Sequence, residues 1–510
     1  MLVKTYAASI NGIDAELITI EVNLSSGFRF SIVGLPDSAV KESQDRITTA
    51  IMNSDYPFPR KQIVINLAPA YMRKEGTGYD LTLAVGILAA SDVIASEALE
   101  GYIVMGELSL DGSVRGITAS LSIAIMARQL GFKGFILPKE NAKEAAVVGG
   151  LDIIGVENLT EVVEFLNGNI HIEKTVVDTQ ECFFSKRDVF ESDFKEVCGQ
   201  ETAKRAIEIA VAGGHNLIMI GTPGSGKSML AKCVPSIMPS FTLDEALETT
   251  KIHSVAGQLP KDTSLMTTRP FRSPHNNVSG VALLGGGSYP KPGEISLAHN
   301  GVLFLDELPQ YNRAALEELR QPLEDHKISI SRAKFSAEFP SSFMLIAAMN
   351  PCPCGHYGDP NHECTCSQIE VQKYMSRISG PLMDRIDLQV KISPLSHKEL
   401  LENKGGEKSA DIRARVEKAR KVQQERFKNE KTIHCNGQME KRHCDMYCKI
   451  STEAEELLEK AMKKLNFSAR GYFKVLKLAR TIADLADSAE IDSTHVKEAL
   501  SYRSLDRESW

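Results

Sequence analysis

The sequence has few aromatic residues and no long apolar run. Aromatic side chains make up 6% of its 510 residues, with a single tryptophan. The longest apolar stretch, Leu81 to Ala90, is about half of the roughly 20 residues that a membrane-spanning helix needs. The N-terminus has no basic segment leading into an apolar one, so we expect no secretory signal. These absences predict a cytoplasmic protein with no membrane partner.

Net positive charge is also missing. The chain has 59 Lys and Arg against 66 Asp and Glu, a net charge of −7, so any contact with nucleic acid has to be local. Hydrophobic residues at 43% and charged residues at 25% exclude a largely disordered chain. Cysteines are not lacking, since there are ten. In a reducing compartment they indicate metal binding or simple burial rather than disulfides.

Three segments differ in pattern, and the length suits about three domains. Residues 1–173 mix apolar strands and helices with glycine turns, and 174–194 form a polar linker. Residues 195–395 alternate strand-like and helical runs, which predicts a parallel α/β sheet. Residues 396–510 are helical in character. The predicted fold class is therefore α/β with a helical C-terminal lid.

The strongest motif is a Walker A loop between an apolar strand and a helix start. Glycines in such a loop let backbone N–H groups approach phosphate, Lys227 reaches the β and γ phosphates, and Ser228 ligates Mg²⁺. A glycine-rich turn with a stray lysine is the alternative. The motif predicts ATP binding by Gly221, Thr222, Pro223, Gly224, Ser225, Gly226, Lys227 and Ser228.

Two later strands end in polar residues. The run Val302-Leu-Phe-Leu precedes Asp306 and Glu307, which suit Mg²⁺ binding and polarisation of the attacking water. Another apolar run precedes Asn350, whose amide suits orienting water beside the γ-phosphate. Alone, each would be an ordinary turn. With the Walker A loop they predict a Mg²⁺-dependent ATPase.

Two arginines are candidates to complete this site. Arg385 follows a Gly-Pro turn and suits an arginine finger toward a neighbouring subunit. Arg470 opens a helix of the C-terminal segment and suits sensing the nucleotide. A surface salt bridge is the alternative for each.

Four cysteines follow Asn350 closely, as C-x-C-x₉-C-x-C with His356 and His362 between the pairs. Four thiolates suit tetrahedral Zn²⁺, which would brace the loop after Asn350, and a loop of free thiols is the alternative. A looser group, Cys435, Cys444 and Cys448 with His434 and His443, we interpret as free thiols. The predicted zinc ligands are Cys352, Cys354, Cys364 and Cys366.

Longer stretches make the chain similar to a known family. They run from Ala212 to Lys227, Arg269 to His275, Pro292 to Leu308, and Asn350 to Gly355. In these the chain resembles the YifB/ComM family of magnesium-chelatase-like AAA+ ATPases over essentially its whole length. The resemblance implies a homo-hexameric ring with ATP between subunits, and a helicase that promotes branch migration during natural transformation. It also implies that Arg385 acts in trans, that Arg470 is the sensor-two arginine, and that Gln200 lies near adenine.

This class resembles the replicative MCM helicases in having a β-hairpin before the Asn350 strand. Residues from Lys327 onward alternate apolar and polar side chains, with Arg332 and Lys334 near the tip. Six copies would put about twelve positive charges around a pore, which predicts DNA binding there. An exposed hairpin with solvated charges is the alternative.

The N-terminal segment resembles the Lon-protease-like α+β fold, from Gly106 to Val114 and from Gly131 to Asn141. Proteolysis of that type needs a Ser nucleophile and a Lys base. Gly78 stands in the nucleophile's place and Leu121 near that of the lysine. Thr77 has a hydroxyl nearby but no matching lysine, so we expect a proteolytically inactive domain that binds DNA or supports the ring.

The leading prediction is thus an ATP-driven DNA motor with ATP and Mg²⁺ as cofactors and Zn²⁺ as a further candidate. A magnesium-chelatase motor subunit would share the central and C-terminal segments, but it would not need the N-terminal one. A protein-remodelling ATPase would use the same ATP site. An aromatic pore loop would favour remodelling, whereas Arg332 and Lys334 favour phosphate.

Overall fold

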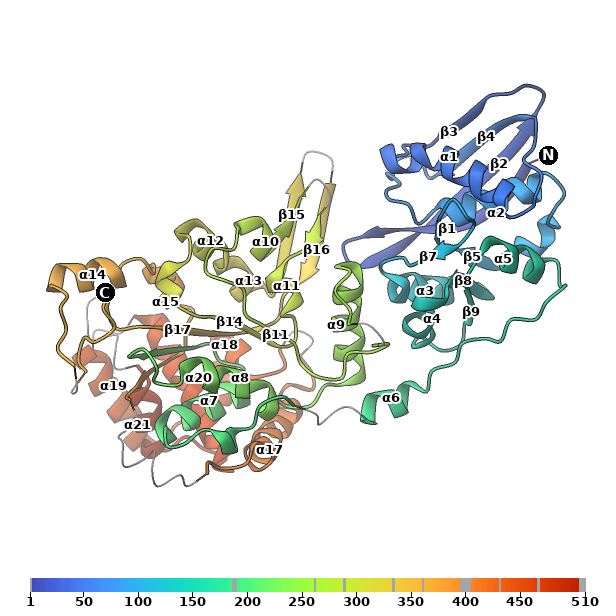
Figure 1. Ribbon diagram of the computed structural model, residues 1–510. Helices are drawn as coiled ribbons and strands as arrows, with labels where there is room; N and C mark the ends of the chain where they lie inside the picture. The colour runs from blue at the N-terminus through green and yellow to red at the C-terminus, as the bar shows by residue number, and fades with distance from the viewer. Residues whose placement is uncertain are drawn as a thin grey trace. The chain divides into compact units, whose positions relative to one another are not determined.

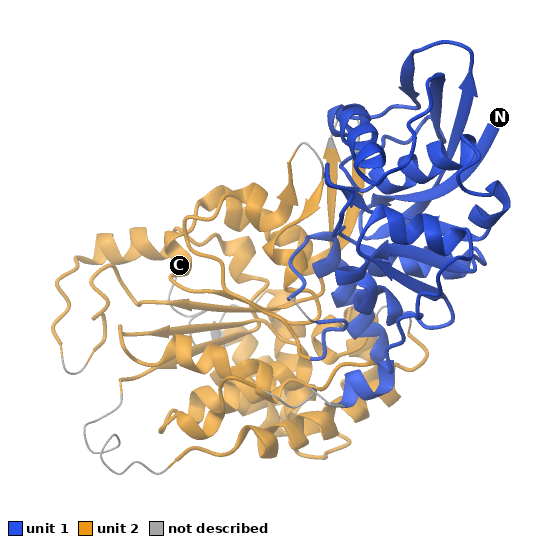
Figure 2. Cartoon of the chain, turned by 45° about the vertical axis from the view of Figure 1, so that its right-hand side comes forward, with its two compact units in different colours: residues 1–186, 243–267 blue, residues 187–242, 268–510 orange. Residues whose placement is uncertain are grey.

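The computed structural model divides the chain into two compact units (Figure 2). The first contains Met1–Lys186 and Leu243–Thr267, and the second contains Arg187–Thr242 and Thr268–Trp510. The structure describes residues 2–185, 190–260, 263–287, 290–332, 335–359, 362–394, 405–430, 433–465 and 468–503. No helix among these residues is long and apolar enough to cross a membrane.

The first unit is built on a mixed seven-stranded sheet of order β3-β4-β2-β1-β5-β8-β9 (Figure 1). Alternate residues of β2 are buried, as expected for a strand with one covered face. The apolar stretch noted above forms α2, in which every residue is buried. The strands are β1 (Leu2–Asn11), β2 (Asp14–Ser25), β3 (Phe30–Val33), β4 (Gln62–Ala68), β5 (Tyr102–Val104), β8 (Gly134–Pro138) and β9 (Asp152–Val156). The helices are α1 (Ser38–Asn53), α2 (Asp80–Ala90), α3 (Ser120–Gln129), α4 (Lys139–Ala146), α5 (Leu159–Leu166) and α6 (Thr179–Ser185).

Helix α9 (Leu243–Val255) joins the first unit although the sequence prediction had put it in the segment 195–395. The side chain of Ser254 donates a hydrogen bond to the buried carboxylate of Glu144. The same carboxylate accepts the amide of Leu121 at 3.0 Å. Because these partners are more than a hundred residues from α9 along the chain, local pattern gave no sign of the contact.

The second unit is built on a five-stranded sheet of order β11-β14-β17-β10-β18, in which every pair is parallel. Strands β14 and β17 are buried along their whole length, which matches their continuous apolar runs. A parallel α/β sheet, as the alternating pattern predicted, is therefore confirmed. The strands are β10 (Leu217–Gly221), β11 (Phe271–Arg272), β14 (Val302–Leu305), β17 (Met344–Met349) and β18 (Leu388–Ile392).

A hairpin and several helices complete the part of this unit before residue 395. Strands β15 (Lys327–Arg332) and β16 (Phe335–Pro340) pair antiparallel as a hairpin, as the alternating pattern predicted. The helices are α7 (Glu201–Gly213), α8 (Lys227–Cys233), α10 (Gly280–Leu284), α11 (Glu294–Leu297), α12 (Arg313–Glu318), α13 (Arg320–Asp325), α14 (Gln368–Met375) and α15 (Gly380–Met383).

The described residues after 404 are helical and share one hydrophobic core with the parallel sheet and α7. Cys435, Cys444 and Cys448 are all buried in this region. A buried ion-pair network joins its helices, since Asp484 accepts from both Arg426 and Arg480. The helices are α17 (Ser409–Phe427), α18 (Lys441–Tyr447), α19 (Thr452–Leu465), α20 (Ala469–Leu485) and α21 (Ser493–Ser501).

Candidate functional site

Three loops of the second unit meet at one edge of the parallel sheet. They follow β10, β14 and β17, which are neighbours in the sheet. Since parallel strands end at the same edge, the residues after them lie close together. Strand β10 lies between β17 and β18, and open α/β sheets bind ligands at the carboxyl ends of strands where the strand order reverses.

The Walker A loop has the backbone that its glycines predicted. Gly224 and Gly226 have φ of 75° and 88°, in the left-handed region that L-residues with a side chain rarely adopt. At Gly221 the constraint is space, because a Cβ there would lie 2.5 Å from the carbonyl oxygen of Ile392. The loop thus passes directly from β10 into α8, which begins at Lys227.

Lys227 is buried and joins the first loop to the third. Its Nζ donates to the carbonyl oxygens of Gly221 and Thr222 at 2.8 Å each, and lies 3.3 Å from Oδ1 of Asn350. Burial lowers the pKa of Lys227, and the charges of Asp306 and Glu307 act in the opposite direction. The ammonium group therefore lies between the Walker A loop and the end of β17.

Ser228 and Asp306 join the first loop to the second. The hydroxyl of Ser228 donates to Oδ2 of Asp306 at 2.7 Å, and the amide of Glu307 donates to Oδ1 at 2.9 Å. A hydroxyl oxygen and a carboxylate oxygen at this separation form the donor set that Mg²⁺ prefers. Glu307 has φ of 51°, a left-handed conformation that turns the chain directly after Asp306.

Asn276 is a site residue that the sequence analysis missed. Its Nδ2 donates to Oε2 of Glu307 at 3.0 Å and lies 3.3 Å from Oε1 of Gln310. It directly follows the stretch Arg269–His275, which was noted only for its family resemblance. A single Asn in a loop has no chemical signature, so only the fold brings it to Glu307.

Arg385 lies away from this edge, and none of the contacts among the described residues joins Arg470 to it. Arg385 precedes β18, so it lies at the amino end of a strand about 16 Å long, whereas Lys227 follows the carboxyl end of the neighbouring β10. Its guanidinium pairs with Glu324 at 2.5 Å. Arg470 is exposed at the start of α20, and Lys474 one turn later donates to the carbonyl of Ile386 at 3.0 Å. Neither arginine is brought to Lys227 of its own chain.

The other predicted residues lie as follows. Gln200 precedes α7, and its Nε2 donates to the carbonyl of Ser393 at 2.7 Å, just past the carboxyl end of β18. It therefore lies at the same edge as the three loops. Arg332 ends β15, but its side-chain surroundings and the whole of Lys334 lie outside the described residues.

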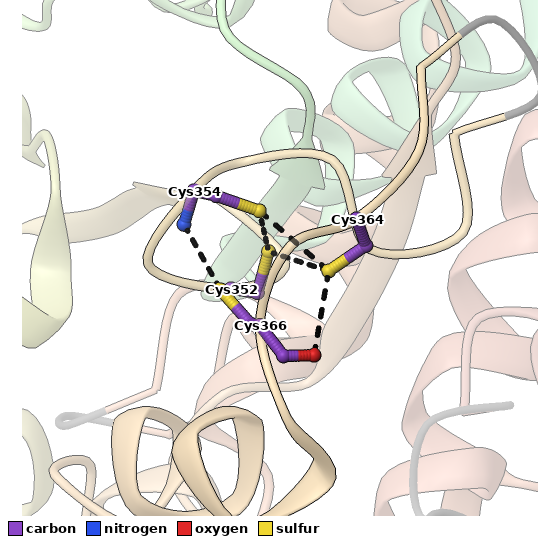
Figure 3. Close-up of side chains that lie close together, drawn as sticks. All are labelled: Cys352, Cys354, Cys364 and Cys366. Carbon is purple, nitrogen blue, oxygen red and sulfur yellow. Dashed lines mark hydrogen bonds between the residues drawn. The ribbon is translucent and has the colours of Figure 1, made fainter.

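The four clustered cysteines come together in the loop after β17 (Figure 3). The sulfur of Cys352 lies 3.3 Å from that of Cys354 and 3.7 Å from that of Cys364, and the last two are 3.6 Å apart. The sulfur of Cys366 is the fourth of the cluster, and all four lie within 4.8 Å of one another. Tetrahedral zinc with Zn–S bonds of about 2.3 Å needs sulfurs about 3.8 Å apart. The spacing fits that geometry.

Hydrogen bonds around the sulfurs also suit a metal. Backbone amides donate to two of them, that of Tyr357 to Cys352 at 3.3 Å and that of Cys354 to Cys366 at 3.4 Å. Hydrogen bonds from the His356 amide and the Cys352 thiol lower the pKa of Cys354 to about 5, whereas burial and the neighbouring thiols raise the pKa of Cys364 and Cys366. The ring of His356 instead contacts Asp359, with Nδ1 3.1 Å from Oδ2.

The cysteine loop packs against the Walker A loop. Gly355 has φ of 87°, and a Cβ there would lie 2.7 Å from both Cδ and Cγ of Pro223. Asn350, two residues before Cys352, lies beside Lys227 as described above. The cysteine loop therefore lies against the nucleotide loop at Gly355 and begins directly after the end of β17.

In the first unit, the positions that resemble a protease site contain no nucleophile or base. Gly78 is packed so that a Cβ would lie 3.3 Å from Cε of Met105, and Leu121 is buried. The hydroxyl of Thr77 donates a hydrogen bond to the carboxylate of Glu107. Lys74 is fully buried, and its Nζ donates to the carbonyls of Pro69 and, at 2.7 Å, of Met72.

Comparison with known proteins gives matches along most of the chain. Family models described as "Magnesium chelatase, subunit ChlI", "Subunit ChlI of Mg-chelatase" and "Magnesium chelatase, subunit ChlI C-terminal" match residues 193–400, 20–141 and 406–503. The chain is 42% identical to the competence protein ComM of Haemophilus influenzae, over 99% of this chain and 98% of ComM. It is 41% identical to YifB of Escherichia coli, over 99% and 97% of the two chains.

Two further matches are partial. Lon protease 2 of Bacillus subtilis is 28% identical over an alignment of 189 residues that covers 31% of this chain and 33% of the protease. The DNA replication licensing factor mcm5 of Dictyostelium discoideum is 27% identical over an alignment of 177 residues that covers 32% of this chain and 20% of that factor. The first supports a Lon-like domain.

Proposed function

This chain belongs to the YifB/ComM family of magnesium-chelatase-like AAA+ ATPases, and on that premise we propose that it is an ATP-hydrolysing DNA motor. In this proposal it works as a homo-hexamer and promotes branch migration of DNA in recombination or natural transformation. Family membership supports an ATPase that uses ATP and Mg²⁺. The DNA substrate, the hexamer and the residue roles below are our inference.

The observation that carries the proposal is the contact between three sheet-edge loops. Ser228 and Asp306, 2.7 Å apart, would hold Mg²⁺, which neutralises charge on the phosphates when bound. Lys227 would reach the β and γ phosphates from its position beside Asn350. Glu307 would polarise the attacking water. Asn276, which donates a hydrogen bond to the carboxylate of Glu307, would orient that carboxylate.

The hexamer is supported by the position of the two arginines. A finger that acts on a γ-phosphate has to lie within a few ångströms of it, and Arg385 is separated from its own Lys227 by the length of a strand. A second copy whose amino-end edge meets the carboxyl-end edge of the first would supply both Arg385 and Arg470. Such a head-to-tail contact closes into a ring when repeated.

DNA as the substrate is supported by two kinds of observation. The antiparallel hairpin of β15 and β16 ends in a segment that contains Arg332 and Lys334, whose charges suit phosphate. Among relatives, one is named a competence protein and another a DNA replication licensing factor. In this proposal the N-terminal residues 1–173 form an inactive Lon-like domain, with Gly78 and Leu121 in place of the catalytic pair.

Zinc bound by Cys352, Cys354, Cys364 and Cys366 is the second part of the proposal. The sulfur spacing and the two N–H···S bonds support it. A metal there would be structural, because all four positions are taken by protein ligands. It would fix the loop that follows Asn350 and lies against the Walker A loop.

The test is the ATPase rate with and without four-way DNA. We expect DNA to raise the rate, Lys227→Ala to abolish it, and Arg332→Ala with Lys334→Ala to keep the basal rate but lose the stimulation. Lys327→Ala is the matched control, because this lysine lies on the same hairpin but pairs with Glu338 at 3.0 Å. A rate that is indifferent to every DNA form would refute the motor and favour protein remodelling or a chelatase-type role.

A further inference from the structure

One end of the seven-stranded sheet brings two loops together. Strand β2 ends at Ser25, which pairs with Gln62 at the start of β4, and β3 starts at Phe30, which pairs with Ile63. The amide of Ile63 donates to the carbonyl of Arg29 at 2.8 Å. The loop of residues 26–29 and the segment of residues 57–61 are therefore adjacent, with the three strands side by side in Figure 1. We name these two segments together the sheet-end surface.

The sheet-end surface is positively charged although the chain is acidic. Arg29, Arg60 and Lys61 are all exposed, and none of their side chains has an ion-pair or hydrogen-bond partner among the described residues. Residues 25–36 and 56–68 contain no Asp or Glu, in a chain with a net charge of −7. Three uncompensated cations within two adjacent loops favour a phosphate-bearing partner.

The same surface contains an exposed aromatic residue, directly before Arg29 in the chain. Phe28 is 91% exposed, more than any other large hydrophobic residue among those described. The loop that contains it passes close to β4, because Gly27 has φ of 135° and a Cβ there would lie 3.1 Å from Oε1 of Gln62. An exposed ring beside cations is the arrangement with which proteins bind single strands, since every base has a face on which an aromatic side chain can stack.

We propose that the sheet-end surface binds single-stranded DNA, with Phe28 stacked on a base and Arg29, Arg60 and Lys61 bound to the flanking phosphates. This rests on the proposed DNA function, and it adds a second contact far in sequence from the β15–β16 hairpin. A motor that moves a branch point separates strands, and a stacking surface holds an unpaired strand without regard to its sequence. Duplex DNA offers no exposed base face, so the surface would select the single strand.

The experiment measures binding of a fluorescent oligothymidine to the full chain by anisotropy, at several salt concentrations. Phe28→Ala should raise the Kd roughly 5- to 100-fold, the usual loss for one stacked base. Changing Arg29, Arg60 and Lys61 together to Ala should make the slope of log K against log salt less steep by about 2, since each phosphate contact on a single strand contributes about 0.7. Both variants alter exposed side chains, so their thermal unfolding should match the wild type.

Control variants and a second ligand separate the outcomes. Leu110→Ala and Lys41→Ala remove an exposed apolar side chain and an exposed cation elsewhere in the same unit, and both should bind as the wild type does. If the sheet-end variants bind normally while Arg332→Ala with Lys334→Ala loses binding, the surface is refuted and the motor stands. If the wild type binds no DNA, both fall. Variants that lose affinity for anionic phosphatidylglycerol vesicles, but not for DNA, would also overturn the inference.

Discussion

Gly355 offers a direct test of whether the cysteine loop controls the nucleotide loop. Its φ of 87° makes any L-residue with a side chain unfavourable, by about 1–2 kcal/mol. In addition, a Cβ at this position would lie 2.7 Å from two ring atoms of Pro223, well inside the ~3.5 Å at which carbon atoms first repel. Gly355→Ala therefore has to displace either the cysteine loop or the Walker A loop.

Gly358 is the matched control. It lies in the same loop with φ of 76°, but nothing lies within 4 Å of its added Cβ. Gly358→Ala thus has the same backbone cost without the contact to Pro223. We expect both variants to keep the wild-type metal content, as measured by metal analysis, and to unfold below the wild-type temperature, Gly355→Ala more so because of its contact with Pro223.

ATP hydrolysis should separate the two variants. Displacing catalytic groups by about 1 Å costs as much as a hundredfold in rate, so Gly355→Ala should lower kcat/KM for ATP about ten- to hundredfold. Gly358→Ala should hydrolyse ATP at nearly the wild-type rate. Equal ATPase rates for the two variants would refute the reasoning, because the contact with Pro223 would then have no effect on the site.

The remaining predictions concern the subunit interface, the metal and a half-buried carboxyl group. Arg385→Ala should lower kcat about a thousandfold or more, and mixing it with the inactive Lys227→Ala chain should restore part of the rate, since one type of interface then has both residues; no recovery on mixing would argue against action in trans. Cys352→Ser should lose zinc by metal analysis and unfold at a temperature lower by about 5 °C or more, whereas unchanged metal content would show that the sulfurs are free thiols. Burial raises the pKa of Glu75 to about 7, and its Oε1 has no hydrogen-bond partner among the described residues. This folded-state pKa lies above the unfolded value. The contribution of protonated Glu75 to the stability of the folded chain is therefore complete below pH ~4 and is lost as pH rises through 7. The unfolding temperature of Glu75→Gln relative to wild type should therefore rise between pH 5 and 8, and a constant difference would contradict this.

The sequence predicted the parts of the site that depend on local pattern. Apolar runs that end in Gly221, Asp306 and Asn350 predicted buried strands, and the parallel sheet then brings their ends together. The contact of Asn276 with Glu307 was not predictable, because it depends on how a loop without regular pattern crosses the sheet edge. The membership of Leu243–Thr267 in the first unit was missed for a similar reason, since it depends on Glu144, a distant buried carboxylate.

The strand order bears on a question that the motifs alone left open. The residues proposed to contact phosphate or Mg²⁺, Lys227, Ser228 and Asp306, follow the carboxyl ends of β10 and β14, whereas Arg385 precedes β18 and Lys474, one turn after Arg470, donates to Ile386 at that same end. A five-residue strand separates the two sets, which is more than the reach of an arginine side chain. In the proposed arrangement, one chain therefore binds the nucleotide at one edge of its sheet and presents Arg385 from the opposite edge. Because both edges belong to a single sheet, a chain would complete both half-sites by contacting two neighbours, which is the arrangement of the proposed ring rather than of a two-fold dimer.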